Sequence, residues 1–209
     1  MQTVFVSLFV GYLLGSIPFG YVVGKCRGID IRQHGSGNIG ATNVFRTLGR
    51  NWGVLVFLLD VLKGIVAVQF AMRCLAASAP TPGVYQMAAE QLGIVAGLGC
   101  FLGHCFPVWL GFKGGKGVAV GAGILIGLMP AAAAIGLVLW GIVYKVSRYV
   151  SLASLVAAVS LPVIVWLLER QFGAIFWFSL VISLLAIWRH RSNIQRLLAG
   201  TESRFEKKK

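Results

Sequence analysis

Long apolar segments with few charges dominate this chain and limit the folds that it can adopt. Of its 209 residues, 57% are hydrophobic and only 12% are charged, whereas a soluble domain carries about 25% charged residues. The mean hydropathy is +0.82, so apolar residues are too numerous for a water-exposed surface. In lipid every backbone polar group must be satisfied internally, which favours helices. We therefore predict an all-α integral membrane protein, built as a polytopic bundle.

Seven apolar segments are the expected helices of this bundle. They cover residues 3–23, 53–72, 92–110, 118–129, 130–146, 152–168 and 172–188. A spanning helix needs about 20 residues, but segment 118–129 reaches only about 18 Å at 1.5 Å per residue. It either begins deeper, within the preceding glycine-rich loop, or forms a partial, re-entrant helix. Pro130 is expected to mark the turn into the next helix.

The basic residues predict the orientation of the bundle. If the N-terminus is outside and all seven segments cross, 16 of the 19 Lys and Arg residues lie in cytoplasmic loops and the tail. Cytoplasmic loops are enriched in Lys and Arg, so we expect the C-terminus in the cytoplasm. Membrane topology then accounts for most of the net charge of +13. The basic residues are scattered over short loops, which argues against nucleic acid as a binding partner. We expect one domain over residues 1–209, with a flexible basic tail from about residue 200.

The first of two glycine-rich stretches, residues 35–43, carries three glycines and four small polar residues. Glycine permits positive φ and a close approach of a ligand. The polar residues, which supply hydrogen-bond donors and acceptors, are Ser36, Asn38, Thr42 and Asn43. The alternative is a tight loop followed by a helix whose N-cap is Thr42 or Asn43. If Asn43 begins that helix, Arg46 lies in its first turn, against the helix dipole. Arg46 then either clamps an anion or snorkels at the interface.

The second stretch, residues 113–117, reads KGGKG and precedes a helix expected to begin near Val118. Backbone N–H groups, two ammonium groups and a helix N-terminus all favour an oxyanion. The stretch lacks the first glycine and the hydroxyl of the Walker pattern, which disfavours binding of a nucleoside triphosphate. A flexible loop that is basic only for topology is the alternative. We favour a phosphate-binding site at the membrane edge.

Histidines and intramembrane charges provide further candidates. His190 and Asn193 are spaced i, i+3 at a span end and would share a helix face. They would act either as a base with a hydroxyl-orienting partner or as a headgroup-level anchor. His104 in an apolar span is better explained as a core histidine, and Asp60 with Lys63 as a structural ion pair. The histidines form no metal-binding cluster, so no metal is expected.

Four motifs together resemble one family. Residues 35–43 with Arg46, residues 113–119, residues 148–154 (RYVSLAS) and residues 189–193 (RHRSN) are similar to the acyl-phosphate-dependent glycerol-3-phosphate acyltransferases of bacterial membranes. The resemblance implies a seven-helix inner-membrane protein with its active site on the cytoplasmic side. Its activity would be transfer of a fatty acyl group from acyl phosphate to glycerol 3-phosphate, which yields lysophosphatidate and phosphate in the first step of phospholipid synthesis. The implied partners are the two substrates and membrane lipid, with no cofactor, and we expect a monomer.

The motif match also assigns roles to residues. The implied catalytic residues are Ser36, Arg46, Lys116, His190 and Asn193. Residues expected to bind substrate or phosphate are Gly37, Asn38, Thr42, Asn43, Lys113, Gly114, Gly115, Gly117 and Ser154. Arg46 and Lys116 would hold phosphate groups, while the other catalytic residues would position the acceptor or assist its hydroxyl. The base is either His190 or an oxygen of a substrate phosphate.

Ser151 and Ser154, one turn apart at the start of the sixth segment, either cap that helix or face the site. The four polar pieces are expected to meet at the cytoplasmic face. A transporter of a phosphorylated metabolite is the alternative function. It should show midplane polar residues and internal repeats, whereas this chain gathers its polar groups on one face. A structural membrane subunit would leave both glycine-rich stretches unexplained.

Overall fold

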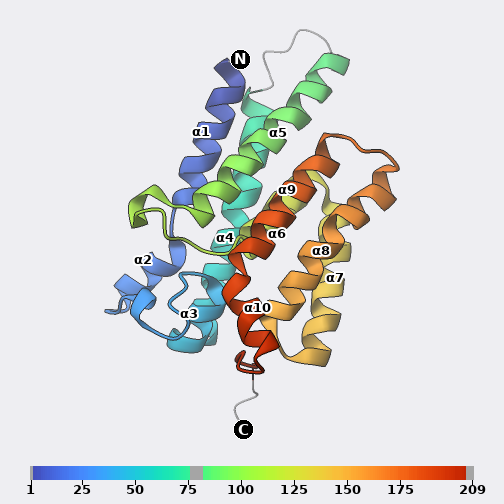
Figure 1. Cartoon of the computed structure of the whole chain (residues 1–209). Coiled ribbons are helices and arrows are strands. Elements are labelled where there is room, and N and C mark those ends of the chain that lie inside the picture. The colour runs from blue at the N-terminus through green and yellow to red at the C-terminus, as the bar shows by residue number, and fades with distance from the viewer. Residues whose placement is uncertain (1, 76–81, 206–209) are drawn as a thin grey trace. The chain divides into compact units, whose positions relative to one another are not determined.

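The structure, a computed structural model, describes residues 2–75 and 82–205, and the regular elements in those ranges are all helical (Figure 1). The chain divides into two compact units, which meet in sequence at Leu128 and Met129. The all-α prediction is therefore confirmed for the described residues. A single domain over residues 1–209 stays a prediction.

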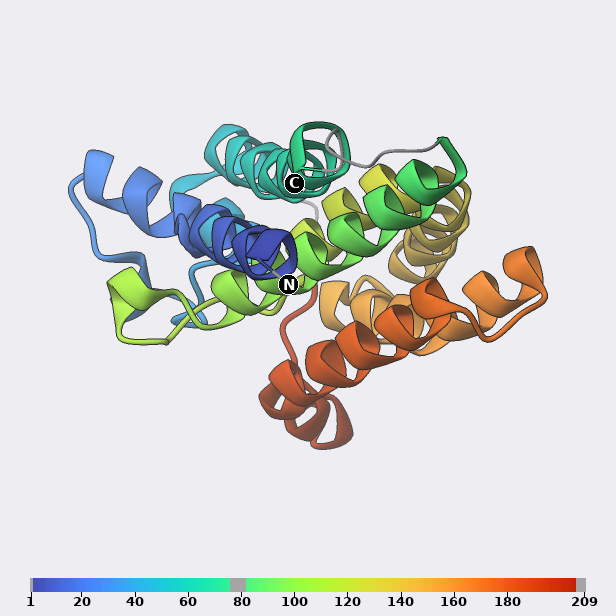
Figure 2. The ribbon, with the colours of Figure 1, turned by 90° about the horizontal axis from the view of Figure 1, so that it is seen from above.

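The first unit contains most of the helices. They are α1 (Gln2–Ser16), α2 (Phe19–Cys26), α3 (Ala41–Leu48), α4 (Arg50–Phe70), α5 (Pro82–Cys105) and α6 (Val118–Leu128). Short 3₁₀ or π turns extend or connect them: η1 (Ile31–Gln33), η2 (Ala71–Leu75) and η4 (Val108–Leu110). α1 lies along α5, and α4 packs against both α6 and α5 (Figure 1, Figure 2). The two glycine-rich stretches precede α3 and α6.

Glycines bring α1 and α5 into close contact. Gly11 and Gly15 lie against the backbone of α5, and Gly99 and Gly103 lie against the backbone of α1. A side chain at any of the four would overlap the backbone of the other helix. In each pair the glycines are four residues apart, so they share one helix face. Close backbone packing of this kind holds helices together in lipid, where burial of apolar side chains gains little.

The second unit contains α7 (Pro130–Ser147), α8 (Val150–Glu169), α9 (Ala174–Arg189) and α10 (Arg191–Leu198). α8 packs against both α7 and α9 (Figure 1). Pro130 occupies the first turn of α7, where its missing N–H needs no partner, as predicted. α9 and α10 meet at His190 with a bend of 57°.

Among the described residues, five helical stretches are long and apolar enough to cross a membrane: Gln2–Cys26, Arg50–Arg73, Ala89–Leu110, Pro130–Ser147 and Val150–Glu169. The bent pair α9 and α10 makes a sixth if it counts as one span. α6 has only 11 residues, in line with the short segment expected there. Helices cover most of each of the seven predicted segments, although the first is interrupted at Ile17 and Pro18 and the third at Phe106 and Pro107. The number of crossings and the orientation stay predictions.

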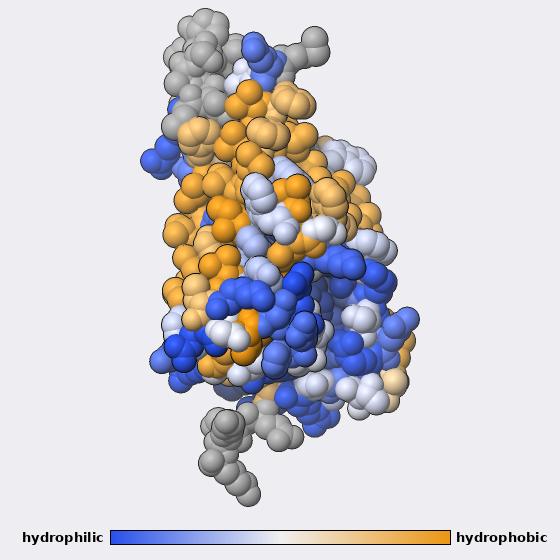
Figure 3. Space-filling model, turned by 90° about the vertical axis from the view of Figure 1, so that its left-hand side faces the viewer, coloured by the Kyte–Doolittle hydropathy of each residue, from blue (hydrophilic) through white to orange (hydrophobic). Residues whose placement is uncertain are grey.

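The surface of these helices is apolar. Large hydrophobic side chains are exposed on the long helices, for example Phe5 on α1, Leu58 on α4 and Leu137 on α7. The face in Figure 3 shows hydrophobic residues over a broad area and hydrophilic residues gathered toward one end. A folded chain with apolar residues outside is suited to lipid. The chain therefore has the surface of an integral membrane protein.

Candidate functional site

The first glycine-rich stretch leads into α3 at least two residues earlier than either proposed cap allows. α3 begins at Ala41 with Gly40 as its N-cap, so the alternative of a cap at Thr42 or Asn43 is wrong. Arg46 consequently lies in the last turn of this eight-residue helix. A cation there is favourable to the helix dipole. The conflict expected for a first-turn Arg46 does not arise, because the helix starts earlier and is short.

Asn43 holds the first stretch together from inside. Its side chain is 2% exposed. The amide Nδ2 donates to three backbone carbonyl oxygens at 2.8–3.1 Å, those of Ile31, His34 and Asn38. Its Oδ1 accepts from the Ser36 N–H at 2.9 Å. Three backbone carbonyl groups and one backbone N–H thus bond to a single buried amide. The Asn43 side chain therefore fixes the path of the chain from residue 31 to residue 38.

The glycines of this stretch adopt backbone conformations that other residues avoid. Gly35 and Gly37 have φ of 58° and 69°, which only glycine adopts at low cost. Asn38 Oδ1 accepts from the Gly40 N–H at 2.7 Å, which closes a second turn. Ser36 is exposed between the two positive-φ glycines. The backbone is therefore preorganised, and Ser36 stands at its exposed part.

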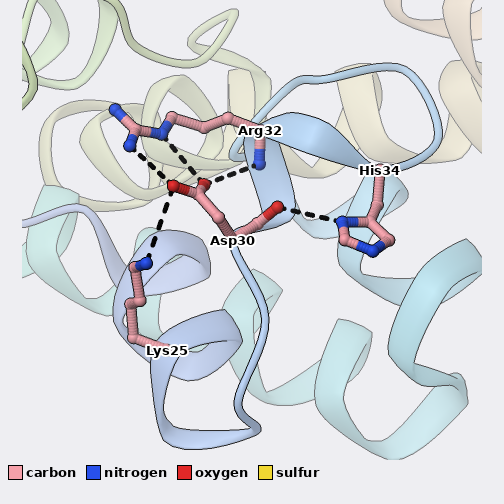
Figure 4. A network of polar contacts seen from close by, with 4 residues as sticks. All are labelled: Lys25, Asp30, Arg32 and His34. Atoms are coloured by element: carbon pink, nitrogen blue, oxygen red, sulfur yellow. Dashed lines mark hydrogen bonds and ion pairs between the residues drawn. The ribbon is translucent and has the colours of Figure 1, made fainter.

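A network of charges precedes the stretch (Figure 4). Arg32 donates to both carboxylate oxygens of Asp30, at 2.9 and 2.7 Å, and Lys25 Nζ lies 3.7 Å from Asp30 Oδ2. His34 Nδ1 donates to the Asp30 carbonyl oxygen at 3.0 Å. The hydrogen bond from Arg32 is the main reason that the pKa of Asp30 lies well below its ordinary value of 3.8. Asp30 therefore stays ionised and ties the preceding segment to the start of the glycine-rich stretch.

The second glycine-rich stretch rests on the end of α5. The Gly114 N–H donates to the Cys105 carbonyl oxygen at 3.1 Å, and the Gly115 N–H donates to the His104 carbonyl oxygen at 3.0 Å. A side chain at Gly114 would overlap the α5 backbone, and one at Gly115 would overlap the His104 ring. These two glycines are therefore required by packing, whatever the stretch binds.

The end of this stretch leads into α6 at the predicted position. Gly117 has φ of 86°, and a side chain there would overlap the ring of Phe101. α6 begins at Val118, as expected. Lys113 is exposed and Lys116 is half-buried, so Lys116 emerges from the packed part of the stretch.

In the second unit, His190 occupies the junction between α9 and α10 and is buried. Its Nδ1 lies 2.7 Å from the Ala186 carbonyl oxygen. A carbonyl oxygen only accepts, so Nδ1 carries the proton, and in the neutral ring Nε2 carries the lone pair. This tautomer is the one that a base acting through Nε2 needs.

A carboxylate that the sequence analysis did not select, Glu202, contacts the predicted site residue Asn193. Its Oε1 accepts from Asn193 Nδ2 and from Ser151 Oγ, both at 2.7 Å, and its Oε2 accepts from Arg196 Nε at 2.7 Å. Burial alone would raise the pKa of Glu202, but these hydrogen bonds outweigh it and hold the pKa below its ordinary value of 4.5. No local pattern marks Glu202, because its role depends on the chain returning to α8.

Further hydrogen bonds hold residues 201–205 in place, where the sequence predicted a flexible tail from about residue 200. The Phe205 N–H donates to the Arg148 carbonyl oxygen at 3.0 Å, and Arg204 Nε donates to the Tyr149 hydroxyl at 2.8 Å. The last four residues of the predicted tail, 206–209, lie outside the described residues. The chain end is thus fastened to the turn between α7 and α8 at least as far as Phe205.

The two serines of α8 do not cap it, because the N-cap is Tyr149. Ser151 donates to Glu202. Ser154 Oγ donates to the Val150 carbonyl oxygen at 2.8 Å and accepts from Trp140 Nε1 at 3.1 Å. Both hydroxyl groups therefore have partners within the second unit.

The predicted site residues fall into two groups. The first unit carries Ser36, Gly37, Asn38, Thr42, Asn43, Arg46, Lys113, Gly114, Gly115, Lys116 and Gly117, and the second carries Ser154, His190 and Asn193. The meeting of all four polar pieces stays a prediction, because it concerns both units together. Among residues 2–75 and 82–205, no three His, Cys, Asp or Glu side chains gather as a metal site would require.

Comparison with known proteins gives consistent matches along the chain. A family model described as glycerol-3-phosphate acyltransferase matches residues 5–200. A glycerol-3-phosphate acyltransferase of Synechococcus sp. (strain CC9902) is 48% identical over 202 residues, covering 96% of this chain and 94% of the relative. Another, from Aquifex aeolicus (strain VF5), is 42% identical over 205 residues, covering 98% of this chain and all of the relative.

Two crystal structures of PlsY (YgiH), an integral membrane glycerol 3-phosphate acyltransferase, are similar to this chain. The glycerol 3-phosphate form has a TM-score of 0.85 and 41% identity, covering 97% of this chain and 96% of that one. The lysophosphatidic acid form has a TM-score of 0.84 and 40% identity, covering 99% and 96%. The likeness thus extends over sequence and fold together.

Proposed function

The chain belongs to the glycerol-3-phosphate acyltransferase family and is an acyltransferase, and we propose that it moves a fatty acyl group from acyl phosphate to glycerol 3-phosphate. The products are lysophosphatidate and inorganic phosphate. The observation that carries the proposal is the 41% identity, over 97% of the chain, to a relative solved in its glycerol 3-phosphate form. Family membership also decides against the alternative of a transporter.

Basic residues of the first unit hold the phosphate groups. Arg46 is exposed on the last turn of α3, and Lys116 is half-buried where the second stretch leads into α6. A guanidinium binds phosphate through a planar fork, and an ammonium acts as a point charge. Both substrates carry phosphate, which explains why residues 113–117 are basic, why Arg46 follows residues 35–43, and why neither stretch contains a carboxylate.

The amides of the first stretch shape it and leave the substrate contacts to other groups. The Asn43 side chain is hydrogen-bonded to the backbone of residues 31–38. The side-chain oxygen of Asn38 accepts from the Gly40 N–H. We therefore assign Asn43 and Asn38 to the conformation of the stretch, and Ser36 to the acceptor. We assign Thr42 and Gly37 to the same preorganised backbone of this stretch.

The reaction needs positioning and charge stabilisation more than a covalent intermediate, because acyl phosphate is already an activated acyl donor. A glycerol hydroxyl oxygen attacks the acyl carbonyl carbon and forms the ester, while the bond from that carbon to the phosphate oxygen breaks. The hydroxyl proton passes to Nε2 of His190 or to an oxygen of a substrate phosphate. Asn193, held by Glu202, orients the acceptor. Cations at the departing phosphate stabilise its developing charge, and orientation lowers the entropic part of the barrier.

We place the reaction at the cytoplasmic side of a bacterial inner membrane, in a monomer whose seven segments all cross with the N-terminus outside. The distribution of Lys and Arg supports this topology. This topology is tested with cysteine variants at the exposed Ser36 and Ser192, in a protein whose exposed Cys26 is replaced by Ser, and with a reagent that does not cross membranes. Both positions should react only after the cells are opened; labelling of one position in intact cells would refute a shared cytoplasmic side.

The activity is tested with purified protein in detergent, radiolabelled glycerol 3-phosphate and three acyl donors in parallel: acyl phosphate, acyl-CoA and acylated carrier protein. Labelled lysophosphatidate should form with acyl phosphate alone. Product formed from either of the other donors, with none from acyl phosphate, would refute the proposed donor. No product with any donor would refute the proposed function.

A further inference from the structure

Asp60 and Lys63 on α4 and His104 on α5 form a cluster of ionisable side chains inside the first unit. Their exposed fractions are 3%, 4% and 5%. Lys63 Nζ lies 2.7 Å from Asp60 Oδ1 and 3.1 Å from His104 Nδ1, and His104 Nδ1 lies 3.6 Å from the same Asp60 oxygen. An ammonium only donates, so His104 Nδ1 accepts from Lys63, and the neutral ring carries its proton on Nε2.

Lys63 extends this cluster to the break between α1 and α2. Its ammonium donates to the Ile17 carbonyl oxygen at 2.9 Å and lies 5.5 Å from the centre of the Phe19 ring. The carbonyl oxygens at the end of a helix lack intrahelical partners, and Lys63 satisfies one there. A single side chain therefore connects α4 and α5 to the turn that leads into α2.

The far edge of the His104 ring faces the second glycine-rich stretch. Nε2 lies where a side chain on Gly115 would have to go. The backbone carbonyl of His104 also accepts from the Gly115 N–H, as Cys105 does from Gly114. Lys116 is the next residue along the chain. The backbone just before Lys116 thus packs directly on the His104 ring. The other edge of that ring is hydrogen-bonded to the buried ammonium of Lys63.

Stability alone gives a weak reason for such a cluster. Desolvation of a buried ion pair offsets most of the attraction between its charges, and apolar residues of similar volume often serve as well. Ionisable residues within membrane helices are rare and tend to serve function. From the sequence alone, Asp60 with Lys63 is expected as a structural pair and His104 as a core residue, because the contact with Gly115 is invisible there.

We propose that Asp60, Lys63 and His104 are positioning residues for the acyl transfer. Asp60 holds the Lys63 ammonium, the ammonium orients the His104 ring, and the ring supports residues 113–117 and through them Lys116. This inference rests on the proposed function in one respect, the phosphate-binding role of Lys116. None of the three residues needs to touch a substrate.

Two substitutions at His104 separate the two edges of the ring. In His104→Asn the amide can still accept from Lys63, but no atom reaches Gly115. In His104→Gln the longer side chain restores an atom near the position of Nε2. We expect kcat/KM to fall about 10- to 100-fold in His104→Asn, the range that a misplacement remote from the chemistry produces. His104→Gln should retain several-fold more activity than His104→Asn.

Hydrogen exchange gives a readout that does not depend on activity. The amides of Gly114 and Gly115 should exchange faster in His104→Asn than in the parent protein, while those of α1 remain protected. The matched control is Gln69→Ala, which removes a hydrogen bond from α4 to the Gly127 carbonyl oxygen (3.0 Å) but touches neither stretch. The control should leave both activity and exchange at residues 113–117 unchanged.

A double variant covers the case in which the His104 variants do not fold. Asp60→Leu combined with Lys63→Met replaces the buried pair by apolar residues of similar size. We expect a folded protein with reduced kcat/KM and faster exchange at residues 113–117. Wild-type activity and exchange in this variant, or in both His104 variants, would overturn the inference.

Lys116→Ala distinguishes a failure of this inference from a failure of the proposed function. Full activity in Lys116→Ala would remove the phosphate-binding role of Lys116, while exchange at Gly114 and Gly115 would still report whether His104 supports the stretch. Loss of activity in Lys116→Ala with unchanged exchange in His104→Asn would leave the proposed function standing and refute the positioning role.

Discussion

Glu202→Gln should loosen the chain end from the second unit. The carboxylate accepts three hydrogen bonds at 2.7 Å, from Ser151, Asn193 and Arg196. A carboxamide has the same shape but only one acceptor oxygen, so at least one donor loses its acceptor. A hydrogen bond to a charged group contributes about 1.5–3 kcal/mol. Arg196 is 39% exposed, and solvent screening reduces the expected loss to about 1–2 kcal/mol.

Glu202→Ala removes both acceptor oxygens, and with them all three hydrogen bonds, and should cost more, about 2–4 kcal/mol in all. For a chain of this size, 1 kcal/mol corresponds to about 2–4 °C in Tm. We therefore expect a decrease of about 2–8 °C for Glu202→Gln and a larger one for Glu202→Ala. Activity should fall by more than the loss of folded protein explains, because Asn193 loses the hydrogen bond that orients its amide.

Thermal unfolding in detergent, followed by the loss of the monodisperse peak in size-exclusion chromatography, measures both variants. The matched control is Glu169→Gln, since the Glu169 carboxylate at the end of α8 is exposed and accepts a long 3.4 Å hydrogen bond from Gln171. The control should melt with the parent protein. If Glu202→Ala also melts with the parent, the contacts of Glu202 contribute nothing and the reasoning is refuted.

Four further predictions concern the reaction, the helix packing and the response to pH. Lys116→Ala should lower kcat/KM at least about 100-fold in folded protein, whereas Arg73→Ala should leave lysophosphatidate formation within about two-fold; equal activities would exclude Lys116 from the site. His190→Gln should lower kcat about 10²- to 10⁴-fold if Nε2 takes the hydroxyl proton, and near-normal turnover would leave a substrate phosphate as the base. Gly15→Val should force α1 away from α5 and destabilise the protein by more than about 2 kcal/mol, with an unchanged melting temperature counting against the close packing. Because the pKa of Glu202 lies below 4.5 in the folded protein, its contribution is complete above pH 4.5 and is lost as the pH falls through that lower value. The protection of the residue 201–205 amides, measured as the exchange rate relative to the intrinsic rate at the same pH, should therefore fall in acid in the parent protein, and this fall should be absent in Glu202→Gln.

Elements with a local cause were predictable from the sequence. Each of the seven apolar segments is mostly helical, because backbone groups in lipid must bond within their own segment whatever the neighbours are. The start of α6 at Val118 and of α7 at Pro130 followed from glycine and proline, whose effects also act locally. The family followed from four short motifs, since residues that perform chemistry leave their types and order in the chain.

The sequence by itself therefore determined the all-helical membrane fold, the family and the residue types of the reaction. The tertiary structure alone decided what those residues contact. Asn43 bonds to the backbone of its own loop, Gly115 packs against the His104 ring, and Glu202 reaches Asn193 from the chain end. Each of these contacts joins side chains or backbone groups whose distance depends on how the chain folds back, which no local pattern of residues records.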